Sequence, residues 1–183
     1  MLSVLTTDQK GVLAEQAVAV EAMRHGLGVF LPLGDERYDL ILDLRPALLR
    51  VQCKWAARNG DVVQVRTRRS RRGPEGFIHR SYRPDEIDVI AASCDELRTC
   101  YLLPPELSVG RALVQLRLTP SRNNQQRLIN WASDYEFRAT LARLRGPIAQ
   151  LGERLRGTQK VAGSSPAGSI GKPPSGRLSL FES

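Results

Sequence analysis

Residues 38–55 read YDLILDLRPALLRVQCKW, and this stretch decides the fold. Two runs, 37–44 and 49–55, flank the turn-forming residues Arg45-Pro46-Ala47-Leu48, a pattern that predicts a β-hairpin. If the turn is centred on Pro46-Ala47, Asp39 lies opposite Lys54, and alternate residues along each strand share a face. One face is then almost wholly apolar and should pack on the core: Tyr38, Leu40, Leu42, Leu44, Leu49, Val51, Cys53 and Trp55.

The other face of the hairpin carries polar groups. Its members are Asp39, Ile41, Asp43, Arg50, Gln52 and Lys54, with Ile41 opposite Gln52 and Asp43 opposite Arg50. A carboxylate, an amide and an ammonium group therefore converge at the open end of the hairpin. A register shifted by one residue would instead place these groups on opposite faces.

This combination of groups suits the hydrolysis of a phosphodiester. A divalent metal that polarises the phosphate takes oxygen ligands. Asp39 offers a charged oxygen, Gln52 a neutral one, and the backbone carbonyl of Cys53 a third. Lys54 is suited to orient the attacking water or to stabilise charge on the phosphorane. Spacing alone fits equally well the solvated side of a half-exposed hairpin, with Asp39 and Lys54 as an ion pair worth ~0.2–1 kcal/mol.

The rest of the chain predicts one α/β domain, residues 1–137, with a mixed sheet flanked by helices. A first helix should have Thr7 or Asp8 as its N-cap and should be stopped by Gly26 and Gly28. Its predicted core stripe consists of Val12, Leu13, Ala17, Val20 and Met23. Glu15 must lie at the edge of that stripe, where it can add a second carboxylate to the site. Strands are predicted at 29–33, 61–68, 88–93, 99–103 and 112–118, a polar loop at 69–76, and a helix at 131–144.

The net charge of +8 is unevenly distributed. Residues 138–183 hold eight basic and two acidic residues, which leaves only +2 for residues 1–137. Within that part, residues 50–83 hold ten basic residues against Asp61 and Glu75, a cluster that indicates a phosphate-binding face. An ordinary solvated loop is the alternative. The predicted DNA-binding residues are Arg58, Arg66, Arg68, Arg69, Arg71, Arg72, Arg80 and Arg83, joined by the polar residues Asn123 and Asn124.

Residues 138–183 are expected to form a short helix and then a disordered tail. Gly, Ser and Pro dominate from Gly146 onward, and such a composition buries too little surface to order itself. The tail also resembles a tRNA gene read as protein: residues 149–155 fit a D-arm and residues 161–167 fit a T-arm, in the right order. An ordinary disordered tail predicts the same physical behaviour.

Several classes of protein are excluded by the composition. No stretch approaches the ~20 apolar residues that cross a bilayer, and the first residues do not resemble a signal peptide, so a cytoplasmic protein without membrane contact is expected. The three cysteines have no CxxC spacing, and with only two histidines they make a poor zinc set. Reduced and buried thiols are therefore expected.

The ordered motifs resemble a known family. Asp39, Gln52 and Lys54, after a helix that bears Glu15, look like the pattern of PD-(D/E)XK nucleases. The likeness is closest to the group I intron-associated endonucleases of that superfamily, in which glutamine can take the acidic position. It extends through residues 51–55, 82–92, 120–125 and 131–135. The chain departs from the pattern at Tyr38, which precedes the aspartate, and at Gln52, whose missing charge should weaken metal binding.

This resemblance implies a restriction-endonuclease-like core and an active site made of Glu15, Asp39, Gln52 and Lys54. Its metal ligands would be Asp39, Gln52, the Cys53 backbone carbonyl and Glu15, and its cofactor Mg²⁺ or Mn²⁺. The expected activity is cleavage of double-stranded DNA by a homing or mobile-element endonuclease that forms a homo-oligomer, a dimer or a tetramer. Two alternatives remain open at this point: a Holliday-junction resolvase, and a catalytically weak DNA-binding module on the same fold.

Overall fold

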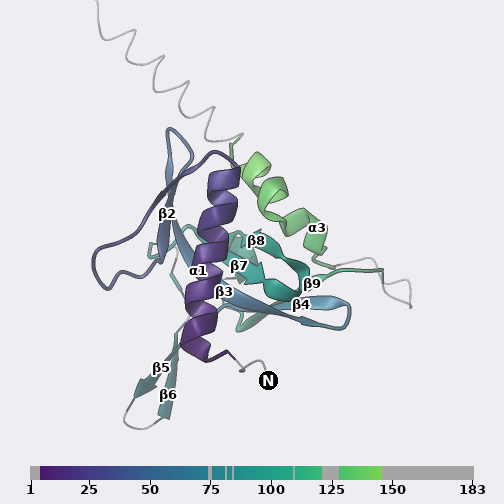
Figure 1. Cartoon of the computed structure of the whole chain (residues 1–183). Helices are drawn as coiled ribbons and strands as arrows, with labels where there is room; N and C mark the ends of the chain where they lie inside the picture. The colour runs from purple at the N-terminus through teal and green to yellow at the C-terminus, as the bar shows by residue number, and fades with distance from the viewer. Residues whose placement is uncertain are drawn as a thin grey trace, which may run out of the picture.

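The computed structural model describes residues 5–73, 76–80, 82–83, 85–108, 110–120 and 128–145, and it describes the side chains of these residues except at 69–80. Its main feature is a seven-stranded mixed sheet that carries helices on its faces (Figure 1). This confirms the predicted fold class. The elements are α1 (Thr7–Arg24), β1 (Gly28–Phe30), β2 (Leu40–Asp43), β3 (Leu48–Asn59), β4 (Val62–Arg66), β5 (Arg69–Gly73), β6 (Gly76–Arg80), β7 (Val89–Cys94), a 3-10 helix (Asp95–Leu97), β8 (Thr99–Leu103), α2 (Pro105–Ser108), β9 (Leu113–Arg117) and α3 (Ala132–Tyr135).

The long strand β3 organises the sheet. It pairs antiparallel with β2 through residues 48–51 and with β4 through residues 56–59, and it pairs in parallel with β7 through residues 51–56. Val51 and Ala56 each pair on both sides, so β2 and β4 lie end to end on one edge of β3 while β7 occupies the other. Among the described strands, none lies beside residues 52–55 on that edge, between β2 and β4.

The hairpin of β2 and β3 has the predicted faces but a different register. Leu40 pairs with Val51 and Asp43 with Leu48, so the pairing is shifted by two residues from the prediction and Asp39 stands near Gln52 rather than opposite Lys54. The reason is that the turn closes one residue earlier, where the Leu44 N–H donates to the Ala47 carbonyl at 2.9 Å. Because side chains alternate with a period of two, a shift of two keeps the residues of both strands on their predicted faces. The prediction is wrong for Tyr38, which precedes β2 and packs on the face opposite to Leu40 and Leu42.

Helix α1 is present, but its predicted core stripe is wrong. The helix begins one residue earlier than expected, with Thr6 as N-cap in a capping box with Gln9. Its buried residues are Ala14, Val18 and Ala22, whereas Val12, Leu13, Val20 and Met23 are exposed. Two of the three buried side chains are alanines, whose small size lets the helix backbone approach the sheet closely. The larger apolar residues therefore face outward.

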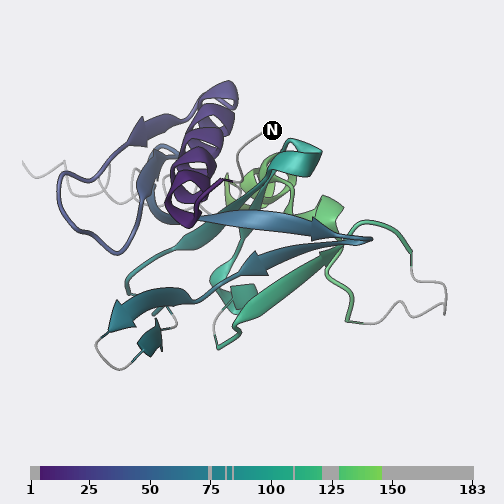
Figure 2. The same ribbon diagram turned by 60° about the horizontal axis from the view of Figure 1, so that its bottom comes forward.

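Two apolar clusters lie on the two faces of the sheet. The first joins α1 to β2, β3, β7 and β8 and includes Phe137 and Leu141 from the helical residues 137–145. Figure 2 shows α1 and this last helical segment on the same side of the sheet. The second cluster, on the opposite face, joins β4, β7, β8 and β9 to Leu107 of α2 and Ala132 of α3.

The other predicted elements mostly agree with the structure. Strands β4, β7, β8 and β9 lie within a residue or two of the predicted ranges, and β1 ends before the predicted strand at 29–33 does. The predicted polar loop at 69–76 is wrong, because β5 and β6 form a two-stranded antiparallel hairpin there. Its arginine-rich strands lack the apolar alternation by which a strand is recognised. The predicted tail and the run 121–127 lie outside the described residues. Among the described helices, none is long and apolar enough to cross a membrane.

Candidate active site

Asp39 lies at the start of β2, beside the uncovered edge of β3. Its backbone N–H donates to the Val51 carbonyl at 2.9 Å, which closes the ladder between the two strands. Its carboxylate then turns to the next exposed donor on that edge: Oδ2 accepts the Cys53 backbone N–H at 2.7 Å. The Asp39 carboxylate thus accepts a backbone hydrogen bond that a neighbouring strand would accept in a continuous sheet.

Gln52 and the Cys53 carbonyl meet Asp39 at the same point. The Gln52 side chain donates from Nε2 to Asp39 Oδ2, and the same nitrogen lies 3.5 Å from the Cys53 carbonyl oxygen. In this arrangement the hydrogen bond from the neutral Gln52 amide stabilises the negative charge of Asp39. A glutamate at the same position would repel Asp39 instead.

Glu15 reaches this group from α1. Burial, and after it the charge of Asp39, raises the pKa of the Glu15 carboxyl above its ordinary value. The pKa of the Cys53 thiol is raised as well, by burial first and then by the charges of Asp39 and Glu15. These effects place Glu15 and Asp39 close enough to repel each other. The structure therefore joins Asp39, Gln52 and the Cys53 backbone by hydrogen bonds and places Glu15 within the electrostatic influence of Asp39.

Lys54 lies on the same face of β3 as Gln52, two residues further along. Its Nζ donates to the Tyr82 hydroxyl at 2.8 Å and lies 5.0 Å from the centroid of the Tyr82 ring. Tyr82 was not predicted as a site residue. It is 28 residues from Lys54 in the sequence and belongs to no catalytic motif, so only its place in the stretch 82–92, which carries the family resemblance, drew attention to it.

The donor set fits a hard divalent cation. Such ions prefer carboxylate, amide and backbone carbonyl oxygens, and these are what Glu15, Asp39, Gln52 and Cys53 present. Within the described part of the chain, no three His, Cys, Asp or Glu side chains are grouped as metal ligands. Two carboxylates must therefore be completed by the Gln52 amide and the Cys53 carbonyl. The mutual repulsion of Glu15 and Asp39 would also be relieved by a cation between them.

An ion pair next to the site holds β3 and β7 in register. Arg50 donates from Nε and Nη2 to the Asp88 carboxylate at 3.0 and 2.8 Å, and its backbone N–H donates to the same carboxylate at 2.7 Å. Although burial acts to raise the pKa of Asp88, the bonds from Arg50 outweigh it and lower that pKa. Asp88 therefore has a structural role, in which it joins the start of β7 to β3.

The predicted DNA-binding arginines fall into two groups. Arg58, Arg66, Arg68 and Arg83 are exposed, and Arg83 forms an ion pair with Asp85 at 2.7 Å. Arg69, Arg71, Arg72 and Arg80 lie on the β5–β6 hairpin, which projects from the body of the fold at the lower left of Figure 1. The side chains on this hairpin are outside the description, and so are Asn123 and Asn124. Their role stays a prediction.

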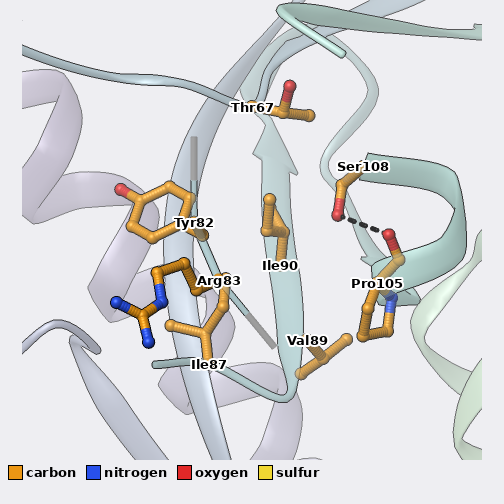
Figure 3. Close-up of a pocket in the computed structure, with 8 residues that line it drawn as sticks. All are labelled: Thr67, Tyr82, Arg83, Ile87, Val89, Ile90, Pro105 and Ser108. Carbon is orange, nitrogen blue, oxygen red and sulfur yellow. Dashed lines mark hydrogen bonds between the residues drawn. The ribbon is translucent and has the colours of Figure 1, made fainter. Parts of the chain in front are cut away.

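A small pocket lies beside Tyr82, on the face of the sheet opposite α1. Figure 3 shows the Tyr82 ring at one wall of it, with the hydroxyl turned away from Ile90, and a hydrogen bond from Ser108 to the Pro105 carbonyl across from it. Most of the lining is apolar, and Thr67, buried in the wall, donates its hydroxyl to the Arg111 carbonyl at 2.5 Å. The pocket therefore gives the Tyr82 ring a packed support.

The chain is similar to known proteins both in sequence and in structure. A family model described as PD-(D/E)XK endonuclease matches residues 5–138, a range that contains Glu15, Asp39, Gln52 and Lys54. Among solved structures, the chain is similar to the bacterial homing endonuclease I-Ssp6803I, with a TM-score of 0.65 and 28% sequence identity over 80% of this chain and 99% of the other. No curated protein matches the chain in sequence.

Proposed function

Because the chain belongs to the PD-(D/E)XK endonuclease family, we propose that it hydrolyses phosphodiester bonds in double-stranded DNA with the help of a divalent metal ion, Mg²⁺ or Mn²⁺. The observation that carries this proposal is the gathering of Asp39, Gln52 and the Cys53 carbonyl at the uncovered edge of β3, with Glu15 beside them. An ordinary half-exposed hairpin has no reason to concentrate two repelling carboxylates at one point.

In this proposal each residue has a distinct role. Asp39, Glu15, Gln52 and the Cys53 carbonyl would hold the metal ion, whose positive charge would polarise the scissile phosphate. Gln52 would turn its amide so that the carbonyl oxygen, rather than Nε2, faces the metal. Lys54 would orient the attacking water and stabilise the charge that develops on the phosphate. The basic residues around the site would hold the DNA backbone through salt-dependent contacts.

The test is a plasmid-cleavage assay with Mg²⁺ or Mn²⁺ and with EDTA as a control. Asp39→Asn should abolish nicking, and Lys54→Ala should reduce it to a low residual rate, while DNA binding remains in both. Asp43→Asn is the matched control: Asp43 lies on the same face of β2, but its carboxylate accepts the Arg45 backbone N–H at 2.9 Å, a bond that asparagine can also accept. If the wild-type protein binds DNA but cleaves none in either metal, the chain is a DNA-binding module and the nuclease proposal is wrong.

The finer proposal is a homing or mobile-element nuclease associated with group I introns. It is supported by the similarity to a homing endonuclease, and it requires cleavage at one long target sequence rather than at many sites. Sequencing the products cleaved from a library of random duplexes tests this requirement. Faster cleavage of a four-way junction than of any linear duplex would favour a resolvase instead.

We propose that a second copy of the chain supplies a second active site, so that both strands are cut in one binding event. The outer face of α1 supports this. Leu13, Gln16, Val20 and Met23 follow one another at alternating spacings of three and four residues, the repeat by which helices pair, and all four are exposed. Exposed apolar side chains at this repeat favour pairing of α1 with the α1 helix of a second copy of the chain.

A further inference from the structure

We propose that Tyr82 is a positioning residue that holds the ammonium group of Lys54 in its working place. The inference rests on the proposed nuclease activity, in which Lys54 acts on the attacking water and the phosphate. Nothing in the sequence motif assigns a role to Tyr82. The structure, however, gives Lys54 two contacts with this one side chain.

The two contacts constrain Lys54 in complementary ways. The hydrogen bond from Nζ to the Tyr82 hydroxyl, 2.8 Å long, fixes the distance and the direction of the ammonium group. The ring centroid, 5.0 Å from Nζ, adds the attraction between a cation and an aromatic face. A lysine side chain has four carbon atoms and many rotamers, so an ammonium held at two points reaches the reacting atoms far more often than one held at none.

Tyr82 can serve as a fixed point because the chain that follows it is tied to β3. The Arg83 backbone N–H donates to the Glu86 carboxylate at 3.1 Å, and the Ile87 N–H donates to the Arg83 carbonyl at 3.4 Å. The turn ends at Asp88, which is bonded to Arg50 of β3. Arg50 and Lys54 lie four residues apart on one face of that strand. The strand therefore carries both the anchor of the turn and the lysine that the turn's tyrosine contacts.

Packing supports the ring from the other side. Tyr82 is half-buried and packs against the second apolar cluster, and it forms part of the pocket wall in Figure 3. Its hydroxyl points away from the apolar residues of that wall, toward the side on which Lys54 is found. The ring is thus held by apolar contacts while the hydroxyl is presented to the lysine.

The test separates the hydroxyl from the ring. Tyr82→Phe keeps the ring and its packing, so it should lower kcat by about threefold to tenfold with the KM for DNA unchanged; Tyr82→Leu removes both contacts and should lower kcat by about thirtyfold or more. In a Lys54→Ala background, Tyr82→Phe should have no further effect on the residual rate. Tyr135→Phe is the matched control, since Tyr135 also packs on the second cluster and lies under a cation, Arg143.

A full wild-type rate in Tyr82→Phe, or the same fold loss with and without Lys54, would overturn the proposal. A second measurement does not depend on cleavage. The chain has four lysines, at 10, 54, 160 and 172, so ¹³C-methylation of their amines gives a simple spectrum in which Lys54→Ala identifies the Lys54 signal. That signal should move in Tyr82→Leu and not in Tyr135→Phe. If it moves and the wild-type protein still cleaves no DNA, the nuclease proposal fails while the contact stands; if it stays in place, the positioning role is refuted.

Discussion

The Asp39 carboxylate accepts the Cys53 backbone N–H at 2.7 Å, across an edge of β3 that none of the strands in the described part of the chain covers. This relationship explains why the candidate active site forms where it does. An exposed strand edge offers backbone donors and acceptors that need partners, and here a side chain supplies the donor's partner while the Cys53 carbonyl stays at the same edge. The gap between β2 and β4 thus creates a site where a carboxylate, an amide and a backbone carbonyl meet.

Glu15→Gln should stabilise the metal-free protein near pH 7 while abolishing cleavage. Because the pKa of Glu15 is raised in the folded protein, by burial and then by Asp39, its ionisation opposes folding. At a pH below the unfolded pKa, about 4, the carboxyl is protonated in both states and does not lower the free energy of unfolding. The destabilisation grows as the pH rises through the folded pKa. Thermal unfolding in EDTA should therefore show a higher Tm for Glu15→Gln at pH 7 and no difference at pH 3.5.

Glu36→Gln is the control for this experiment, since Glu36 is exposed in the loop before β2 and should leave the Tm unchanged at both pH values. An equal or lower Tm for Glu15→Gln at pH 7 would contradict a raised pKa of Glu15 in the folded protein, and with it both the burial of this carboxyl and its repulsion by Asp39.

Gln52→Glu should bind metal more tightly and fold less stably without it. The substitution replaces the hydrogen bond from Gln52 to Asp39 by a third negative charge, next to Asp39 and Glu15. Without a cation these charges repel one another, and with one they all attract it. Calorimetric titration with Mn²⁺ should show an affinity about tenfold higher, a difference of about 1.4 kcal/mol, and the Tm in EDTA should fall.

The control for that substitution is Gln64→Glu on β4, a half-exposed position that pairs with Ala57 and Gln115 away from the site. Gln64→Glu should alter neither the affinity for Mn²⁺ nor the Tm in EDTA. Unchanged metal affinity in Gln52→Glu would contradict a ligand role for position 52.

The sequence predicted the polar face of the hairpin, but it did not predict the register. Faces depend only on the alternation of side chains, which a shift of two residues preserves, so Asp39, Gln52 and Lys54 were correctly placed together. Register depends on where the turn closes, and the run from Leu44 to Leu48 offers several equivalent places. The local pattern therefore determines which residues share the site, while the turn determines which of them touch.

Hydrophobicity also failed to predict which face of α1 packs on the sheet, but for a different reason. The helix has two apolar sides, and the side with larger residues was taken for the core. Contact with the sheet instead selected Ala14, Val18 and Ala22, whose small size permits close packing. Tyr82 was missed because a contact across 28 residues leaves no periodic signal in the sequence.

Asp88→Asn should destabilise the protein by about 1 kcal/mol at pH 7, the lower end of the range for a charged hydrogen-bonded pair because Asp88 is about a third exposed. The pKa of Asp88 is lowered in the folded state by the bonds from Arg50, which outweigh the opposing effect of burial. Its stabilising contribution is therefore present at a pH above the unfolded pKa and is lost as the pH falls through the folded one. Urea unfolding at pH 7 and pH 3 should show a larger difference between wild type and Asp88→Asn at pH 7 than at pH 3. Asp85→Asn, which alters an exposed pair with Arg83, should change little at either pH.

Leu13→Glu combined with Val20→Glu should convert the proposed oligomer to a folded monomer. Both side chains are more than 40% exposed on α1, so new charges there do not enter the core of one chain but would face each other in a pair of chains. Light scattering should show a smaller mass, and circular dichroism an unchanged fold. Leu113→Glu is the matched control: Leu113 is 40% exposed on β9 and pairs with Arg66, so the same change there should leave the mass unaltered. A wild-type protein that is already monomeric would contradict the proposal.

Truncation after Arg145 should leave a stable, DNA-binding protein, whereas truncation after Phe137 should not. Leu141 is almost fully buried in the first apolar cluster, and the Thr140 hydroxyl, also buried, donates to the Leu102 carbonyl at 3.3 Å. Removing the buried leucine and its neighbours costs about 3 kcal/mol or more, a large fraction of the stability of a small domain. The Arg145 guanidinium also bonds to the His25 carbonyl at 3.3 Å, which ties the end of this segment to the end of α1. The Tm and the DNA affinity of the two shortened chains should be compared with those of the full chain. A lower Tm or weaker binding after truncation at Arg145 would show that residues 146–183 contribute to stability or to DNA binding.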